Sequence, residues 1–160
     1  YTVLTSSAAS DVYKRQMFGG TGMAFFAAMH YWLPKFYGRM YDKKAATISW
    51  IIIFVGFNIL YMSMKVVGMM GMPRRYYDYL PEFTGLNMLS TVGSWILGFG
   101  LLLMFVNLIR GLRKGEPIED NPWGGATLEW QVATPPPLEN FDEDPVVTHG
   151  PYDYKKAGIL

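Results

Sequence analysis

Residues 83–109 read FTGLNMLSTVGSWILGFGLLLMFVNLI and contain no Asp, Glu, Lys or Arg. Residues 17–34 and 45–64 also lack these charged side chains. About 20 helical residues, at about 1.5 Å each, cross a hydrocarbon layer about 30 Å thick. Within each stretch, apolar residues occupy every face of the predicted helix, whereas a soluble amphipathic helix has one apolar stripe. We therefore predict an all-α membrane helical bundle fragment, and not the buried core helices of a soluble protein. Its three transmembrane helices are Met17–Tyr37, Lys44–Met70 and Leu86–Gly111.

The composition changes from Gly111 onward. This remainder holds nine of the thirteen acidic residues and seven of the ten prolines, including Pro135-Pro136-Pro137 and the acidic run 142–144. Segments rich in proline and charge rarely bury enough apolar surface to form a packed core. We therefore predict a membrane domain at 17–113 and an irregular, solvated polar C-terminal tail at 114–160.

Residues 1–16 match neither the membrane pattern nor the tail pattern. They are not a signal peptide, because their charges follow the small residues and no apolar run precedes a cleavage site. They also adjoin an apolar helix without any capping or linker residues. We predict an artefactual or chimeric segment here and exclude it from the fold.

The overall composition excludes several classes of function. Fourteen basic residues offset thirteen acidic ones, and this net charge of +1 gives no support to nucleic acid as a partner. The absence of Cys excludes disulfides, thiolate metal sites and cysteine nucleophiles. His30 and His149 lie more than a hundred positions apart, so we expect no self-contained multi-histidine metal site.

Basic residues in the connections predict the orientation of the helices. Seven of them lie on one side of the predicted bundle and two on the other, and cytoplasmic loops are enriched in Lys and Arg. We therefore expect the first connection and the tail in the cytoplasm. The basic residues on that side are Lys35, Arg39, Lys43, Lys44, Arg110, Arg113 and Lys114, against Arg74 and Arg75 on the other.

Arg74 and Arg75 follow Pro73, which we expect to end the second helix because proline lacks an N–H and clashes with the preceding turn. Two guanidinium groups would then lie side by side at the outer mouth of the bundle. Guanidinium groups bind carboxylate or phosphate, often bidentately. Residue chemistry alone leaves two interpretations open: lipid headgroup contact, or a specific anionic partner such as a cofactor carboxylate.

For the other polar residues in the membrane domain, a structural role is the default interpretation. Lys65 lies near the end of the second helix, where extension of the side chain to the interface is the default and a proton or ion path is the alternative. Asn58 is expected to bond to a neighbouring helix. His30 is interpreted as a structural hydrogen-bonding residue. Six glycines permit close helix packing; they are Gly19, Gly20, Gly22, Gly93, Gly98 and Gly100.

Several short motifs lie along the chain between Met17 and Phe141. They are Phe18-Gly19-Gly20-Thr21, Trp32-Leu33-Pro34-Lys35, Gly38-Arg39-Met40, Val55-Gly56-Phe57-Asn58, Met72-Pro73-Arg74-Arg75, Asp78-Tyr79, Asn121-Pro122-Trp123-Gly124, Thr127-Leu128-Glu129-Trp130 and Pro135-Pro136-Pro137. In this order they resemble helices ten and eleven and the C-terminal tail of heme–copper oxidase subunit I. The form Met72-Pro73-Arg74-Arg75 is most similar to the bacterial cytochrome c enzymes.

The resemblance implies a function for the whole subunit and for the arginine pair. It implies the catalytic subunit of a proton-pumping respiratory oxidase, which reduces O₂ to water with electrons from cytochrome c and uses two hemes and copper. Arg74 and Arg75 match the adjacent arginines that bind the heme propionates in this family. The implied partners are membrane lipid, oxidase subunits II and III, and cytochrome c through subunit II, in the bacterial inner membrane with a cytoplasmic C-terminus.

Departures from the family pattern limit what this fragment can do. Aligned without gaps, the two heme-ligating histidines of helix ten fall on Val12 and Lys14, and the copper ligands precede the matched region. We therefore expect no catalytic residue and no metal ligand here, and no heme or copper bound by the fragment alone. The alternatives are quinol-oxidase subunit I, a non-catalytic multi-pass accessory or assembly subunit, and a transporter fragment that uses Lys65 and Asn58.

Overall fold

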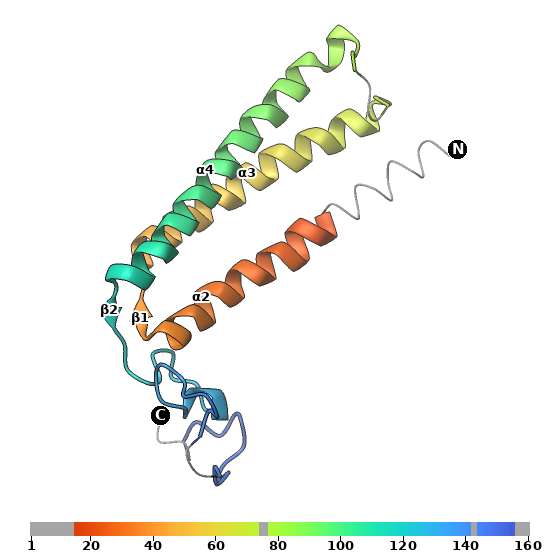
Figure 1. Cartoon of the computed structure of the whole chain (residues 1–160). Coiled ribbons are helices and arrows are strands. Elements are labelled where there is room, and N and C mark those ends of the chain that lie inside the picture. The colour runs from red at the N-terminus through yellow and green to blue at the C-terminus, as the bar shows by residue number, and fades with distance from the viewer. Residues whose placement is uncertain (1–14, 74–76, 142–143, 156–160) are drawn as a thin grey trace. The chain divides into compact units, whose positions relative to one another are not determined.

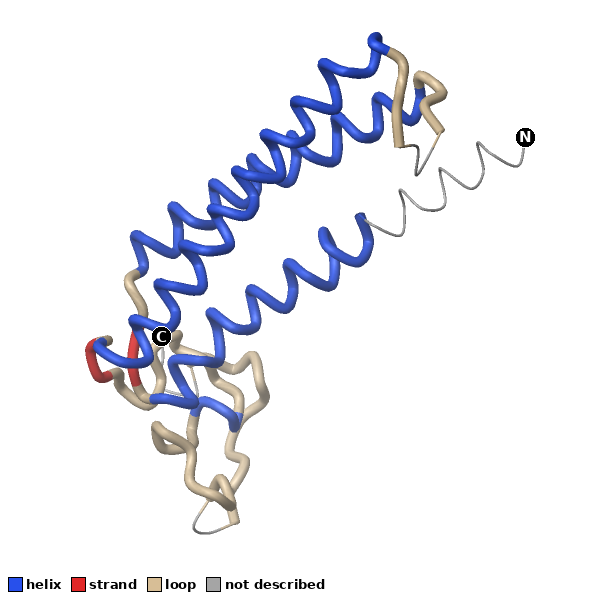
Figure 2. Tube along the Cα trace, turned by 45° about the horizontal axis from the view of Figure 1, so that its top comes forward, coloured by secondary structure: helices blue, strands red, loops and turns tan. Residues whose placement is uncertain are grey.

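The computed structural model of the chain describes residues 15–73, 77–141 and 144–155. Its elements form two compact units: the described residues up to Ala27 with Lys43–Asn107, and Ala28–Asp42 with the described residues from Leu108 onward. Helix dominates the first unit and loops dominate the second (Figure 2). In chain order the elements are the π-helix η1 (Arg15–Gly22), α2 (Met23–Tyr37), β1 (Arg39–Met40), α3 (Lys43–Met69), the 3-10 helix η2 (Pro81–Phe83), α4 (Thr84–Lys114), β2 (Glu116–Pro117) and the 3-10 helix η3 (Leu128–Trp130) (Figure 1).

All three predicted helices are present as helices, and their ends differ from the predicted ones by a few residues. Two helical segments, Lys43–Met69 and Pro81–Lys114, are long and apolar enough to cross a membrane. α2 has 15 residues and continues directly from the π-helix η1. Two of the predicted helices are therefore candidate membrane spans by length and composition, and a crossing by the first predicted helix stays a prediction.

α3 and α4 lie side by side and antiparallel in the first unit (Figures 1 and 2). Glycines allow the two backbones to approach closely. A Cβ built on Gly56 would lie 2.5 Å from the Leu97 nitrogen, and Cβ atoms on Gly93 and Gly100 would lie 2.6 and 2.9 Å from backbone nitrogens of α3. The expected packing role is confirmed for Gly93 and Gly100, but it is wrong for Gly98, which faces open space.

The η1 segment of the same unit packs against α3 through aromatic rings. The rings of Phe18 and Phe57 stack at 5.8 Å with an interplanar angle of 14°. A Cβ on Gly19 would lie 3.1 Å from the end of the Phe57 ring, so this glycine is in close contact as expected. Gly20 has open space around it, which contradicts the expected packing role at that position.

A glycine motif ends α3 before Pro73 is reached. Gly71 adopts a positive φ of 92°, and its N–H donates to the Gly68 carbonyl at 3.2 Å. The Met72 N–H donates to the Val67 carbonyl at 3.3 Å. These two bonds form the Schellman arrangement, in which a left-handed residue satisfies the last helical carbonyls. The expectation that Pro73 ends the helix is therefore wrong, although the proline does prevent the helix from resuming.

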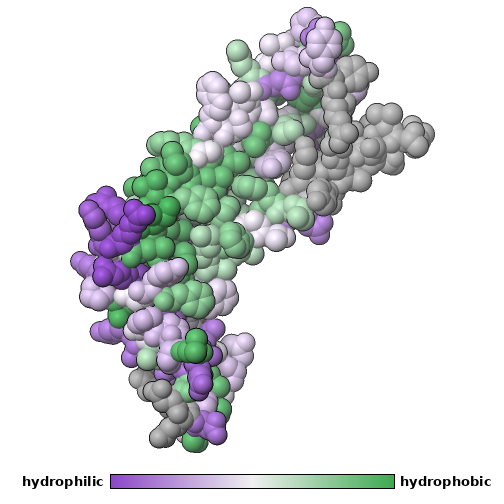
Figure 3. Space-filling model, in the orientation of Figure 1, coloured by the Kyte–Doolittle hydropathy of each residue, from purple (hydrophilic) through white to green (hydrophobic). Residues whose placement is uncertain are grey.

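On the face that Figure 3 shows, hydrophobic residues gather over the middle of the molecule, where the two long helices run. Trp95 and Leu102 of α4 are 73% and 60% exposed, and Phe54 of α3 is 52% exposed. A contiguous exposed apolar surface of this kind is typical of a segment that contacts lipid or another protein. The described first unit thus has the surface expected of a membrane helix pair.

The second unit contains most of the polar tail. A short antiparallel ladder, absent from the sequence prediction, pairs Arg39 with Pro117 and Met40 with Glu116. Between residues 118 and 155 the only regular element in the described residues is η3, as predicted for an irregular tail. The expected solvation is wrong around η3, because three tail side chains are at least 94% buried. They are Ala126, Trp130 and Val132.

Candidate functional site

The predicted anion-binding pair, Arg74 and Arg75, lies outside the described residues. The structure does describe both ends of the loop that carries the pair. Asn87 of α4 donates its side-chain N–H groups to the Met72 sulfur at 3.5 Å and to the Phe83 carbonyl at 3.0 Å. The two ends of the loop are thus joined by one amide within the first unit, and Phe83 beside it is 5% exposed.

The predictions for the polar residues within the bundle differ in how they compare with the structure. Asn58 donates its side-chain amide to the Phe54 carbonyl of its own helix at 2.8 Å, so the expected bond to a neighbouring helix is wrong. Lys65 is half-buried in α3, and its role stays a prediction. His30 meets the Tyr41 ring edge to face at 4.9 Å within the second unit. Burial raises the pKa of the Tyr41 phenol, which lies in the connection before α3.

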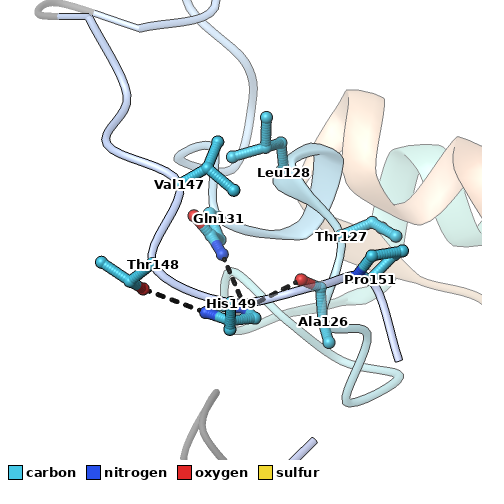
Figure 4. Close-up of a pocket in the computed structure, with 8 residues that line it drawn as sticks. All are labelled: Ala126, Thr127, Leu128, Gln131, Val147, Thr148, His149 and Pro151. Atoms are coloured by element: carbon cyan, nitrogen blue, oxygen red, sulfur yellow. Dashed lines mark hydrogen bonds between the residues drawn. The ribbon is translucent and has the colours of Figure 1, made fainter. Parts of the chain in front are cut away.

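His149 belongs to a small pocket that the sequence analysis did not identify (Figure 4). Its Nε2 donates to the Ala126 carbonyl at 3.2 Å, because a carbonyl can only accept. Its Nδ1 is 3.1 Å from the Thr148 hydroxyl. The pocket has a volume of about 250 Å³. Its lining residues carry no formal charge apart from the titratable His149; they are Ala126, Thr127, Leu128, Gln131, Val147, Thr148, His149 and Pro151.

Metal ligation finds no support within the residues that the structure describes. No group of three or more His, Asp or Glu side chains lies close enough together to hold an ion in that part of the chain. Both histidines have contacts inside the second unit. The donor set present in the described ranges therefore does not fit a copper site or a bis-histidine heme site.

Residues 118–135, here called the tail clasp, make several hydrogen bonds to the C-terminal end of α2 within the second unit. Lys35, just beyond the charge-free residues 17–34, is 3% exposed. Its Nζ donates to the carbonyls of Asp120, at 2.7 Å, and of Val132.

Aromatic rings form the apolar part of the clasp. The Trp123 ring stacks on Tyr31 at 6.0 Å and 16°, and its indole N–H donates to the Tyr31 carbonyl at 3.0 Å. The Trp130 ring meets Tyr31 edge to face at 4.9 Å and is 2% exposed. The Lys35 ammonium lies 5.8 Å from the centre of the Trp130 ring. Offset and edge-to-face pairs of this kind add to the stabilisation from burial alone.

A side chain also closes the loop between the two tryptophans. The Asn121 amide donates to the Gly125 carbonyl at 2.8 Å, and its Oδ1 accepts the Gly125 N–H at 2.8 Å. Gly124, between them, has a positive φ of 66°. A Cβ on Gly125 would lie 2.3 Å from Cδ1 of Trp130, so only glycine lets that ring pack here.

Glu129 links the clasp to α2 on the exposed side. Its Oε2 accepts the Trp32 indole N–H at 3.3 Å, and its Oε1 accepts the Thr127 hydroxyl at 3.2 Å. Both carboxylate oxygens are therefore held by donors. An ammonium, an indole and a carboxylate thus hold the clasp on the end of α2.

Comparison with known proteins places the chain in a family. A family model described as Cytochrome C and Quinol oxidase polypeptide I matches residues 15–115. The chain belongs to this family. Cytochrome c oxidase subunit 1 of Synechocystis sp. is 43% identical over 138 residues, which are 86% of this chain and 25% of that protein. The same subunit of Thermostichus vulcanus is 39% identical over 138 residues, again 86% of this chain and 25% of that protein. In Streptomyces coelicolor, the probable cytochrome c oxidase subunit 1-alpha is 43% identical over 129 residues, or 78% of this chain and 22% of that protein.

The match to the oxidase polypeptide I family covers the three helices and the loop with Arg74 and Arg75. It ends at residue 115, before the tail clasp begins. The chain spans about a quarter of the length of the curated relatives it matches. The resemblance drawn from short motifs is therefore confirmed at the level of the family.

Sequence reasoning missed the role of Lys35 and named the tail aromatics only as parts of family motifs. In the sequence, Lys35 counts only among the basic residues predicted on the cytoplasmic side, whereas the structure buries this side chain. One feature of the sequence does indicate burial of Lys35: it directly follows Trp32-Leu33-Pro34, and a lysine in an aromatic segment often buries the aliphatic part of its side chain. Its acceptors, however, lie 85 and 97 positions away in the chain.

Proposed function

We propose that the chain is the C-terminal part of cytochrome c oxidase subunit I. The full subunit would be the catalytic subunit of a proton-pumping respiratory oxidase that reduces O₂ to water with electrons from cytochrome c. The observation that carries this proposal is 43% identity over 138 residues to a protein named cytochrome c oxidase subunit 1. The family match supports neither the accessory-subunit nor the transporter interpretation.

The proposal gives Arg74 and Arg75 the role of binding the propionates of both hemes. Two adjacent guanidinium groups suit two pairs of carboxylates, because each can bind bidentately and keep the carboxylate charged. The loop that carries them joins the two membrane-capable helices, and Asn87 fixes both of its described ends. Heme, when bound, supplies the electron-transfer chemistry.

We propose that the ligands of the heme irons and of copper come from parts of the subunit outside the matched region. The positions that match the heme-ligating histidines are Val12 and Lys14, both outside the described residues, and neither side chain can replace an imidazole ligand in the family's manner. The described part brings together no ligand cluster. We therefore assign no step of oxygen reduction and no copper ligand to the residues that the structure describes.

The proposed setting is the bacterial inner membrane, with the chain crossing several times and the C-terminus in the cytoplasm. The proposed partners are membrane lipid, oxidase subunits II and III, and cytochrome c through subunit II. Support comes from the exposed apolar surface of α3 and α4 and from the asymmetric distribution of Lys and Arg. Subunit I of a quinol oxidase is the second candidate, because the family description includes quinol oxidases.

A test of the propionate role uses a full-length subunit in which residues 17–155 replace the matching segment of the Synechocystis subunit. Arg74→Leu and Arg75→Leu should shift the heme midpoint potentials, since loss of an opposite charge raises the proton affinity of a propionate. Lysine at either position should rescue only partly, because an ammonium lacks the planar fork. Arg113→Leu is the control, because this arginine lies at the other end of α4.

Three outcomes separate the interpretations. Shifted potentials in both leucine variants, with normal assembly, support propionate binding. Unchanged potentials in both variants would favour the lipid-headgroup interpretation of the pair. Oxidation of quinol in place of cytochrome c by the assembled enzyme would support the second candidate and leave the arginine result intact.

A further inference from the structure

The tail clasp is held on α2 through its main chain as well as by its aromatic rings. The two carbonyls that Lys35 binds, of Asp120 and Val132, stand on either side of the Asn121–Gly125 loop and η3. One side chain of α2 therefore fastens both ends of that intervening segment. Because the contacts are to carbonyl oxygens, an apolar replacement of Lys35 would leave both acceptors without this donor.

Bonds within the tail bring these two carbonyls together. The Asp120 carboxylate accepts the Thr134 N–H at 2.8 Å, and the Asp120 carbonyl is 3.4 Å from the Thr134 hydroxyl. The beginning and the end of the clasp are thus tied to each other as well as to Lys35. A segment closed in this way can dock or leave as one piece.

We propose that Lys35 is the latch of the tail clasp, a positioning residue that holds residues 118–135 on the end of α2 by donating to two main-chain carbonyls. Removal of its donors releases this segment as a unit and leaves the α3–α4 pair folded. The clasp belongs to the second compact unit, whereas α3 and the part of α4 up to Asn107 belong to the first, so the clasp can open while this part of the helix pair stays folded. This role is separate from the heme-propionate role proposed for Arg74 and Arg75.

Limited proteolysis of the full chain in detergent tests the latch. A protease that cuts after Glu reports clasp opening at Glu129, whose following residue Trp130 is buried. Glu139 beyond the clasp is an exposed internal reference, and Glu82 in η2, which is followed by the buried Phe83, reports opening of the first unit. In Lys35→Met, cleavage after Glu129 should accelerate about tenfold or more, where a factor of ten corresponds to about 1.4 kcal/mol. Cleavage after Glu82 and Glu139 should keep its wild-type rate.

Two further variants test the cause of faster cleavage in Lys35→Met. The cause could be loss of the bonds to the two carbonyls, loss of an ion pair with Asp120, or loss of one positive charge at any position. Lys114→Met removes an exposed ammonium at the end of α4 and should change nothing. Asp120→Asn removes the carboxylate charge but keeps the main-chain carbonyl and an oxygen for the Thr134 N–H, so the clasp should stay closed. Acceleration in Lys35→Met alone supports the latch.

Other outcomes overturn the proposal. Wild-type cleavage after Glu129 in Lys35→Met shows that the donors are not needed. Equal acceleration at Glu82 and Glu129 shows global unfolding in place of local release. If Asp120→Asn opens the clasp as much as Lys35→Met does, an ion pair holds the tail and carbonyl binding does not. Amide hydrogen exchange of residues 118–135 gives an independent readout that does not depend on protease access.

Discussion

Gly56 of α3 is in direct backbone contact with Leu97 of α4, since a Cβ built on Gly56 would lie 2.5 Å from the Leu97 nitrogen and 2.8 Å from its Cα. No flexible side chain is involved at these two points, so neither helix can relax by changing a rotamer. On the facing helix, Cβ atoms built on Gly93 and Gly100 would lie 2.6 and 2.9 Å from backbone nitrogens of α3. Three glycines thus set the distance between the helices.

Substitution of Gly56 should therefore separate the two helices. Gly56→Leu must push the α4 backbone away, and overpacking of this kind costs about 1–3 kcal/mol or more. Gly98→Leu is the matched control, because Gly98 lies on the same helix pair with open space around it. Unfolding by SDS, followed by helical circular dichroism, should show a lower midpoint for Gly56→Leu only. Equal midpoints for the two variants would contradict the backbone contact.

Gly125 should be as intolerant of substitution as Gly56, for a different reason. A Cβ there would lie 2.3 Å from the Trp130 ring, which is 2% exposed and has no room to move. We expect Gly125→Ala to displace Trp130 and to raise cleavage after Glu129 several-fold. Gly150→Ala is the control in the same unit, because its Cβ would make only an ordinary contact at 3.6 Å. Wild-type protection in Gly125→Ala would contradict this packing.

The Asn121 amide should contribute measurably to the same segment. Asn121→Ala removes both bonds to Gly125 in a half-buried place, and two unmade hydrogen bonds cost about 1–3 kcal/mol together. Asn121→Asp keeps the acceptor for the Gly125 N–H but loses the donor to the Gly125 carbonyl. Hydrogen exchange of residues 118–135 should therefore increase most in Asn121→Ala and less in Asn121→Asp. An equal rate in wild type and Asn121→Ala would show that the amide pair adds nothing.

The sequence predicted the helices well because their signal is local. A stretch such as residues 83–109 has no charge to desolvate, and this property can be read without any knowledge of its neighbours. The end of α3 is also encoded locally, but in the positive φ of Gly71 and not in Pro73, to which the prediction assigned it. Arg74 and Arg75 stay a prediction, since they lie outside the described residues.

The tail clasp could not be predicted from local signals. Composition marks residues 114–160 as irregular, and the described part of this range is indeed poor in helix and strand. Burial of Trp130 and Lys35, however, depends on contacts between positions separated by most of the chain. A proline-rich polar segment with a few aromatic residues therefore looks solvated until its partner helix is known.

The orientation of the chain can be tested directly, because the sequence contains no cysteine and one introduced Cys is unique. Tyr77, in the loop between α3 and α4, is 102% exposed, and Leu138, in the tail, is 101% exposed, so both positions accept a label without disturbing a contact. The distribution of Lys and Arg predicts that the tail lies in the cytoplasm and the loop outside. A membrane-impermeant maleimide added to intact cells, with access to the outer face of the inner membrane, should therefore modify Tyr77→Cys and spare Leu138→Cys. Permeabilised cells supply the control, since both variants should then react. Labelling of Leu138→Cys before permeabilisation would place the tail outside and reverse the topology.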